Sequence, residues 1–143
     1  IDLSITHTAK LIIAAVAANA RIGLDIEMLG RALSDDFARG VFTHEELELA
    51  AHTGEAPTAI LRFWCAKEAI SKALGTGIRY SPQDLRITAI DTVTGWLQIE
   101  LLGQWLEPFK QLKGRKNPIY TTLYEGHAVA TCLLPASLFE KPE

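Results

Sequence analysis

The hydrophobic pattern of this chain changes its period twice, and that change restricts the fold more than any other feature. Three short apolar runs come first, and the short polar turns between them favour antiparallel neighbours. These runs cover residues 3–8, 11–18 and 21–27. Apolar side chains then recur at helical spacing over residues 58–74, and Gly75 is well placed to end that helix.

Strand-like patterns return in the second half of the chain. These alternating or β-branched runs cover residues 85–90, 96–102 and 120–134. Before the long helix, residues 43–46 have the form of a capping box, which predicts a second, shorter helix beginning there. Strands on both sides of a helical middle predict an α+β fold, in which a small antiparallel sheet packs against a long helix and shorter helices.

Size, charge and cysteine content exclude several classes of protein. With 143 residues, 48% of them hydrophobic, the chain is expected to form a single domain over residues 1–143. A net charge of −3 argues against a general nucleic-acid binder, and no apolar stretch approaches the roughly 20 residues of a membrane span. Neither Cys65 nor Cys132 belongs to a CxxC pair, which predicts reduced thiols in a cytoplasmic protein. The start at Ile1, without Met, is compatible with a fragment of a longer polypeptide.

Two carboxylates share one face of the third predicted strand. The segment 22–27 alternates strictly, so Gly23, Asp25 and Glu27 point the same way while the apolar residues between them point to the core. Carboxylates this close repel one another, and a divalent cation would relieve the repulsion. Mg²⁺ is commonly bound by one or two carboxylates together with water and substrate phosphate. A strand with one polar face is also common without any metal, so the alternation alone leaves both interpretations open.

The long helix carries a second group of charged side chains. Glu68 and Lys72 are four residues apart and lie on one face, where they could form an ordinary exposed ion pair of about 0.3–0.5 kcal/mol. The functional interpretation makes Glu68 a metal ligand or base, with Lys67 and Lys72 neutralising phosphate oxygens. Gly75 and Gly77 follow, where glycine permits close approach of the backbone to a ligand but also commonly ends a helix.

These elements, in this order, resemble the signature of the 4′-phosphopantetheinyl transferase superfamily. Its G-[IVL]-D-x-[EV] strand matches residues 22–27, and its W-x-x-K-E-[AS]-x-x-K helix matches residues 64–72. An intervening F-[ST]-x-x-E element resembles residues 42–46, and residues 72–78 look like the small holo-acyl-carrier-protein synthases. The resemblance covers residues 3–78 and implies the fold of that superfamily.

The first strand is similar to that of the larger, Sfp-type enzymes. Residues 3–8 resemble their S-[IVL]-S-H-[ST] strand, whose serine and histidine contact the 3′-phosphate of coenzyme A. The resemblance implies this role for Thr6, which keeps the hydroxyl of the usual serine, and for His7. Sfp-type enzymes consist of two similar halves, and this chain begins near the second. It either lacks the first half or works as a half-length unit that pairs with copies of itself, like transferase domains fused to polyketide synthases.

The resemblance implies an enzyme that moves phosphopantetheine from coenzyme A to a serine of an acyl carrier protein, with Mg²⁺ as cofactor, and releases 3′,5′-adenosine bisphosphate. Asp25, Glu27 and Glu68 are the expected Mg²⁺ ligands. Glu68 is also the expected base, and Lys72 and Asp25 complete the expected catalytic set. The residues expected to bind coenzyme A are Thr6, His7, Lys67, Lys72, Gly75 and Gly77.

The implied partner is an acyl carrier protein of fatty acid biosynthesis or a carrier domain of a polyketide synthase; no nucleic acid or membrane is expected, and a homo-oligomer is left open. Because carrier proteins are acidic, a basic and apolar docking surface is expected, with Arg31 and Phe42 as candidates by resemblance. Two alternatives remain. One is a noncatalytic docking module or incomplete half-enzyme, which would not need three carboxylates. The other is a different Mg²⁺-dependent phosphoryl enzyme, which no P-loop supports.

Overall fold

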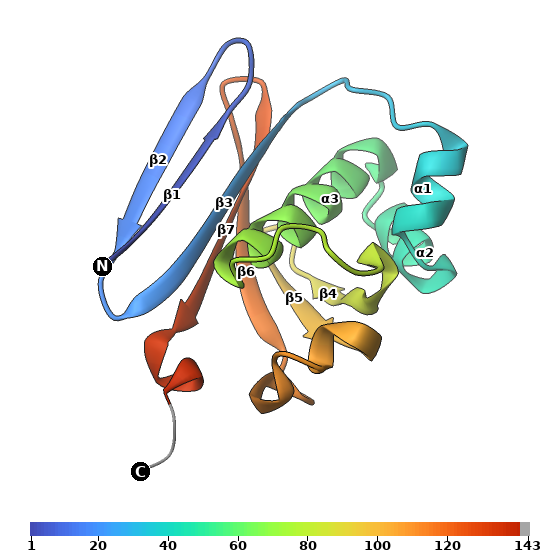
Figure 1. The fold of residues 1–143 in the computed structure, drawn as a ribbon. Coiled ribbons are helices and arrows are strands. Elements are labelled where there is room, and N and C mark those ends of the chain that lie inside the picture. The colour runs from blue at the N-terminus through green and yellow to red at the C-terminus, as the bar shows by residue number, and fades with distance from the viewer. Residues whose placement is uncertain (141–143) are drawn as a thin grey trace.

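The computed structural model describes residues 1–140, and in them a five-stranded sheet, a separate two-stranded hairpin and three helices (Figure 1). The strands are β1 (Asp2–His7), β2 (Ile12–Ala17), β3 (Ala20–Met28), β4 (Leu85–Ile90), β5 (Trp96–Leu101), β6 (Asn117–Tyr124) and β7 (His127–Pro135). The helices are α1 (Asp35–Val41), α2 (His44–His52) and α3 (Ala56–Ala73). The predicted α+β fold is confirmed.

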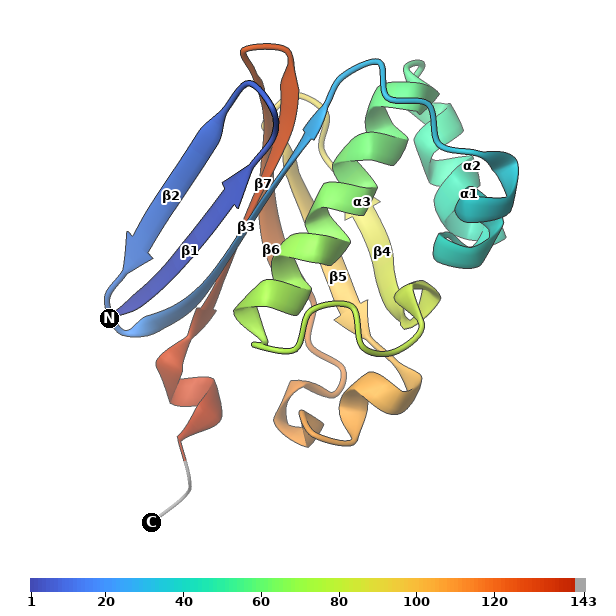
Figure 2. The ribbon, with the colours of Figure 1, turned by 45° about the horizontal axis from the view of Figure 1, so that its top comes forward.

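The helix α3 lies across one face of the sheet, with α1 and α2 beside it (Figures 1 and 2). The strand order is β3-β7-β6-β5-β4, and every neighbouring pair is antiparallel. Small residues on the inner side of α3, such as Ala66, Ala69 and Ala73, are buried and allow the helix to approach the strands closely. Among residues 1–140, no helix has both the length and the apolar character needed to cross a bilayer.

The strand β3 pairs with β7 rather than with the hairpin that precedes it in the chain. The predicted antiparallel pairing is therefore confirmed for β1 with β2, but β2 does not continue it to β3. Side chains of β1 satisfy the free edge of β3 instead: the backbone N–H of Ile22 donates to Asp2 Oδ2 at 2.8 Å, and that of Leu24 donates to Ser4 Oγ at 3.0 Å. The hairpin thereby covers an edge that would otherwise expose unpaired N–H groups.

The hairpin also closes a small second core against the outer face of β3 and β7. Leu24, Ile26 and Val129 are buried there, with Ile13 and Ala15 of β2 packed against them. The apolar positions of β3 thus face the hairpin, while the main core lies on the α3 side of the sheet. Both faces of β3 are therefore covered, which fixes the register of the strand.

Two short helices precede α3, and the sequence analysis identified only one of them. The capping box at the start of α2 is confirmed, because Thr43 Oγ1 accepts from the Glu46 N–H and the Glu46 carboxylate accepts from the Thr43 N–H. The helix α1 was missed. Its signal was present in Ser34, whose hydroxyl caps the helix by accepting from the Phe37 N–H, and in the acidic first turn that follows.

Candidate active site

The predicted alternation of β3 is confirmed, and it directs Gly23, Asp25 and Glu27 toward α3. The glycine explains how the helix comes this close. A Cβ built on Gly23 would stand 1.8 Å from the carbonyl oxygen of Ala69 and 2.6 Å from the backbone nitrogen of Ala73. The absence of a side chain at this position therefore brings the polar residues of α3 next to the two carboxylates of β3.

Each carboxylate of β3 has a cationic partner. Lys72 donates from Nζ to Asp25 Oδ1 at 3.1 Å and to the carbonyl oxygen of Leu24 at 3.0 Å, so the lysine joins α3 to β3 directly. Glu27 pairs with Arg31 at 2.6 Å. The sequence left open an ion pair of Lys72 with Glu68 along the helix, whereas the structure directs the lysine across to β3.

Three carboxylates in this region affect one another electrostatically. Burial raises the pKa of Asp25 from 3.8 to about 6, Lys72 opposes the rise, and Glu68 and Glu27 add to it. Burial also raises the pKa of Glu68, with Lys72 opposing and Glu27 adding. These groups therefore form one acidic cluster, from β3 and α3, in which part of the negative charge is unfavourable without a further cation.

The side chains present suit a hard divalent cation. Asp25 Oδ2 is buried and accepts no hydrogen bond in residues 1–140, so one carboxylate oxygen lacks a partner within the described residues. The cluster offers only oxygen donors, which Mg²⁺ prefers. In residues 1–140 no three His, Cys, Asp or Glu side chains are gathered closely enough to hold a metal ion, and Lys72 and Arg31 pair with two of the three carboxylates.

The raised pKa of Asp25 predicts an unusual dependence of stability on pH. The folded protein holds the Asp25 proton more tightly than the unfolded chain, so the stabilisation is complete below pH 3.8 and is lost as the pH rises through about 6. For the metal-free protein, we expect the free energy of unfolding, relative to that of Asp25→Asn, to fall by on the order of 2 kcal/mol between about pH 4.5 and 7.5. Urea titrations of both proteins measure this difference.

Added Mg²⁺ should reverse that dependence, because a metal binds the ionised carboxylate and stabilises the folded state most at high pH. The Asp25→Asn protein should show neither effect. Parallel pH profiles for the two metal-free proteins would show that Asp25 is not the group responsible.

The position of Lys67 does not support its expected contact with coenzyme A. This side chain is completely buried, and its Nζ donates to Val41 O at 2.9 Å, to Pro82 O at 2.8 Å and to Glu46 Oε1 at 3.0 Å. Because residues 67 and 68 are about 100° apart around a helix, Lys67 points into the core while Glu68 points toward β3. The structure brings Glu68 and Lys72 to the acidic cluster and leaves Lys67 outside it.

The structure separates the two residues of β1 that were expected to bind one phosphate. Thr6 faces inward and is only 5% exposed, whereas His7, the next residue along the strand, is exposed on the opposite face. Of this predicted pair, only His7 is open to a ligand in the folded chain. The resemblance implies both roles together, although neighbouring residues of a strand occupy opposite faces.

The two glycines after α3 lie in the loop that leaves the site. Gly75 and Gly77 have φ angles of 82° and 65°, which favour glycine, and no other group lies within 4 Å of a Cβ built on either. The backbone N–H groups of Thr76 and Gly77 both donate to the carbonyl oxygen of Ser71, which folds the loop back onto the helix. The loop therefore leaves space around both glycines, while their backbone N–H groups already donate to Lys72 O and Ser71 O.

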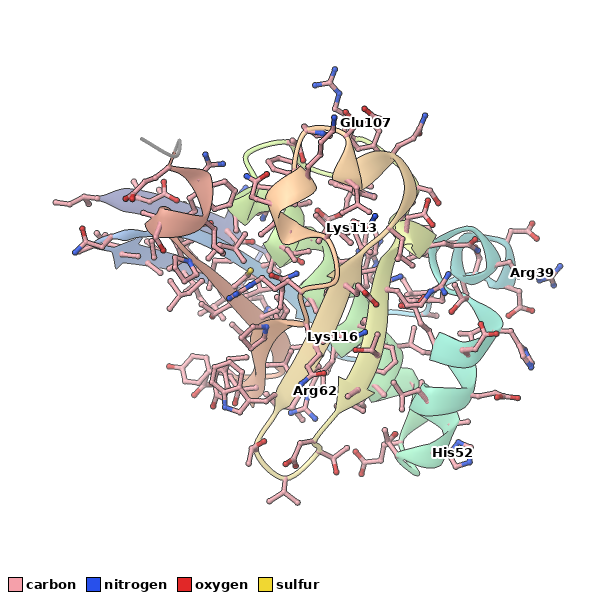
Figure 3. All side chains as sticks on the ribbon, turned by 90° about the horizontal axis from the view of Figure 1, so that it is seen from below. Arg39, His52, Arg62, Glu107, Lys113 and Lys116 are labelled. Carbon is pink, nitrogen blue, oxygen red and sulfur yellow. The ribbon has the colours of Figure 1, made fainter. Side chains whose placement is uncertain are left out.

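Of the two residues expected on a docking surface, Phe42 is buried and Arg31 is exposed. Phe42 is 2% exposed and belongs to the main core, so its assignment to a docking surface is wrong. Arg31 is exposed and lines a largely apolar groove of about 430 Å³ together with Arg39. Sequence reasoning missed Arg39, which extends outward from α1 (Figure 3), because the helix itself was missed.

Fold and site together define a class of protein: a two-layer α+β protein whose edge strand and central helix build an all-oxygen acidic site with a lysine beside it. A family model described as the 4′-phosphopantetheinyl transferase superfamily matches residues 21–132. The chain belongs to this superfamily, and the enzyme class expected from the sequence is confirmed.

Three similar proteins are all described as holo-[acyl-carrier-protein] synthases. The holo-[acyl-carrier-protein] synthase of Dinoroseobacter shibae is 34% identical over 122 residues, which are 74% of this chain and 82% of that protein. The crystal structure of the Neisseria meningitidis synthase matches with a TM-score of 0.59 and 27% identity, covering 79% of this chain and 95% of that one. The Helicobacter pylori synthase, solved in complex with coenzyme A, shares the fold with a TM-score of 0.57, 21% identity, and coverage of 79% and 97%.

Proposed function

We propose that this chain transfers 4′-phosphopantetheine from coenzyme A to a serine of an apo acyl carrier protein, with Mg²⁺ held by Asp25, Glu27 and Glu68. The observation that carries the proposal is the acidic cluster of β3 and α3, with its raised pKa values and its unpartnered Asp25 oxygen. The names of the similar synthases support the same acceptor, and the Helicobacter pylori synthase, solved in complex with coenzyme A, supports the donor. When bound, the metal would neutralise pyrophosphate oxygens and stabilise the charge that develops on the leaving group.

Glu68 is suited to accept the proton of the attacking serine. In the reaction the serine oxygen forms a bond to the β-phosphorus of coenzyme A, the bond from that phosphorus to the bridging oxygen breaks, and 3′,5′-adenosine bisphosphate leaves with the electron pair. The serine proton must go to a base. Burial and Glu27 raise the pKa of Glu68, and a carboxylate with a raised pKa accepts a proton more readily near neutral pH.

Lys72 is a cation of the site that is placed to contact phosphate oxygens. Its side chain is 32% exposed, so it reaches solvent while holding Asp25. In phosphoryl transfer, positioning and electrostatic stabilisation do most of the catalytic work, and a lysine acts there as a point charge. The loop of Gly75 and Gly77 leaves space for a substrate, because no other group in residues 1–140 lies within 4 Å of a Cβ built on either glycine.

The groove of α1, α2 and α3 is the proposed docking surface for the carrier protein. Arg31 and Arg39 lie at its edge, and Leu33, Leu47 and Ile60 line its apolar part. An acidic partner with apolar contacts would complement both features. The groove adjoins the site directly, because Arg31 also pairs with Glu27 of the acidic cluster.

The decisive test uses the purified chain with coenzyme A, Mg²⁺ and an apo acyl carrier protein, followed by the intact mass of the carrier. We expect the carrier to gain one phosphopantetheine, and to gain none when the metal is chelated. Carrier binding without a mass gain, with several carriers, would favour a docking module or incomplete half-enzyme. Hydrolysis of coenzyme A without modification of the carrier would favour another phosphoryl enzyme.

A further inference from the structure

The ammonium group of Lys67 has no N–H left for a substrate. Its three N–H groups meet three acceptors, which are Val41 O, Pro82 O and the carboxylate of Glu46, all within 3.0 Å. The side chain is 0% exposed, and its Nζ lies 5.2 Å from the centre of the Phe42 ring. A phosphate could reach this lysine only if the core opened.

Glu46 extends the same network to other elements. One carboxylate oxygen accepts from the Thr43 N–H at 2.8 Å at the start of α2, and the other accepts from the Ile87 N–H at 2.9 Å in β4. The Glu46 side chain is also 0% exposed. The buried pair of Lys67 and Glu46 therefore fixes α3 to the end of α1, the start of α2, the strand β4 and the turn at Pro82.

The buried pair closes the loop that follows α3. The chain leaves α3 at Ala73, passes through Gly75 and Gly77, and returns to α3 at Pro82, whose carbonyl oxygen accepts from Lys67. Lys67 also directly precedes Glu68, so a contact that fixes the rotation of α3 at Lys67 fixes where the Glu68 carboxylate points. Both the loop and the carboxylate depend on one buried ammonium group.

Stability alone does not explain an ion pair at this position. Replacing a buried ion pair with well-packed apolar side chains of similar volume is often neutral or stabilising. The pair instead fixes the orientation of the elements that it joins, because each of its polar atoms is held by a hydrogen bond to a specific backbone group. Catalytic geometry is sensitive to such control, because a misplacement of about 1 Å can reduce a rate by about a hundredfold.

We propose that Lys67 and Glu46 are positioning residues for the transfer reaction: they orient Glu68 and the 74–81 loop from within the core, and neither contacts coenzyme A. This inference rests on the proposed function. It assigns Lys67 a role opposite to the phosphate-binding role that its place in the sequence motif suggested.

The kinetic test compares Lys67→Met and Glu46→Gln with Lys72→Met, each assayed below its unfolding midpoint and normalised to the folded fraction. Lys67→Met and Glu46→Gln should each lower kcat by about 10- to 100-fold while KM for coenzyme A stays within about twofold. Their double variant should be no worse than the poorer single one, because both act through one network. Lys72→Met should instead raise KM for coenzyme A.

Two results would overturn the inference. If Lys67→Met raises KM for coenzyme A and leaves kcat unchanged, the lysine binds substrate. If both variants have the wild-type kcat per folded molecule, the buried pair serves stability alone, since a purely structural role would not change kcat of the folded fraction.

A second measurement needs neither variants nor turnover. The wild-type protein is treated with an amine-acylating reagent, with and without coenzyme A and Mg²⁺, and the modified lysines are identified by peptide mass. Lys72 should react and become protected by coenzyme A, whereas Lys67 should stay unmodified in both samples. Modification of Lys67 that coenzyme A prevents would contradict the inference even if the variants fail to fold. A wild-type protein that fails to transfer would instead contradict the proposed function, whatever the labelling shows.

Discussion

Glu68→Gln should lower kcat for phosphopantetheine transfer by at least about 100- to 1000-fold, the scale of removing one group that stabilises a transition state. The substitution preserves shape but removes both a proton acceptor and a metal ligand. It should not harm the fold, because in residues 1–140 the Glu68 carboxylate takes part in no ion pair, and burial already disfavours its charge. The measurement is the rate of mass gain on the carrier protein.

The two proposed roles of Glu68 can be separated by titrating Mg²⁺. Loss of a ligand alone would raise the Mg²⁺ concentration needed for half-maximal rate and leave the rate at saturation near the wild-type value. Loss of the base would persist at saturating metal. The matched control is Glu107→Gln, an exposed carboxylate that extends away from the body of the protein in Figure 3, and its activity should be unchanged. An active Glu68→Gln enzyme at all metal concentrations would remove Glu68 from the mechanism.

The polar face of β3 could be predicted from the sequence because a strand has only two faces. Once residues 22–27 form a strand, Asp25 and Glu27 must point the same way. That β3 pairs with β7 could not be predicted in the same manner. The pairing joins residues that are 99 to 115 positions apart, and only the complete sheet decides it.

For Lys67, the helix motif of residues 64–72 and the helical spacing of apolar residues in α3 give different predictions. The motif implies a contact with coenzyme A, whereas the spacing implies burial. Lys67 is four residues after Phe63 and three before Ile70, and both of these are completely buried. Helical spacing therefore places the lysine on the buried side of α3. The same spacing places Glu68 and Lys72 on another face, and the structure confirms that these two approach Asp25. Helical spacing alone therefore predicts a buried Lys67, whereas the general rule that lysine avoids the core predicts an exposed one.

For Thr6 and His7 as well, likeness to a known motif does not predict which side chains are accessible. Their likeness to a known strand suggested one shared ligand, although neighbouring residues of a strand point to opposite faces. Only the position of the hairpin on β3 decides which face is covered, and it covers Thr6. A hairpin that packs through the side chains of Asp2 and Ser4, rather than through backbone pairing, has no recognised sequence signal.

Gly23→Ala should destabilise the fold by at least about 3 kcal/mol, the upper end of the usual cost of overpacking. The added methyl group would stand 1.8 Å from the carbonyl oxygen of Ala69, and backbone atoms of a buried helix cannot move aside as a flexible side chain can. Either the protein unfolds or α3 moves away from β3. Because α3 carries Glu68 and Lys72, that movement should abolish transfer in any protein that remains folded.

The control for this substitution is Gly40→Ala, in α1. A Cβ at Gly40 meets no other group within 4 Å, so the change should be neutral or stabilise the helix by up to about 1 kcal/mol. Urea unfolding of both variants gives the comparison. If Gly23→Ala is as stable as the wild type, the close approach of α3 to β3 is not what the glycine provides. If Gly23→Ala is unstable as expected, Gly23 contributes to the site by setting the distance between β3 and α3. Asp25 and Glu27 of the same strand contribute by their charge.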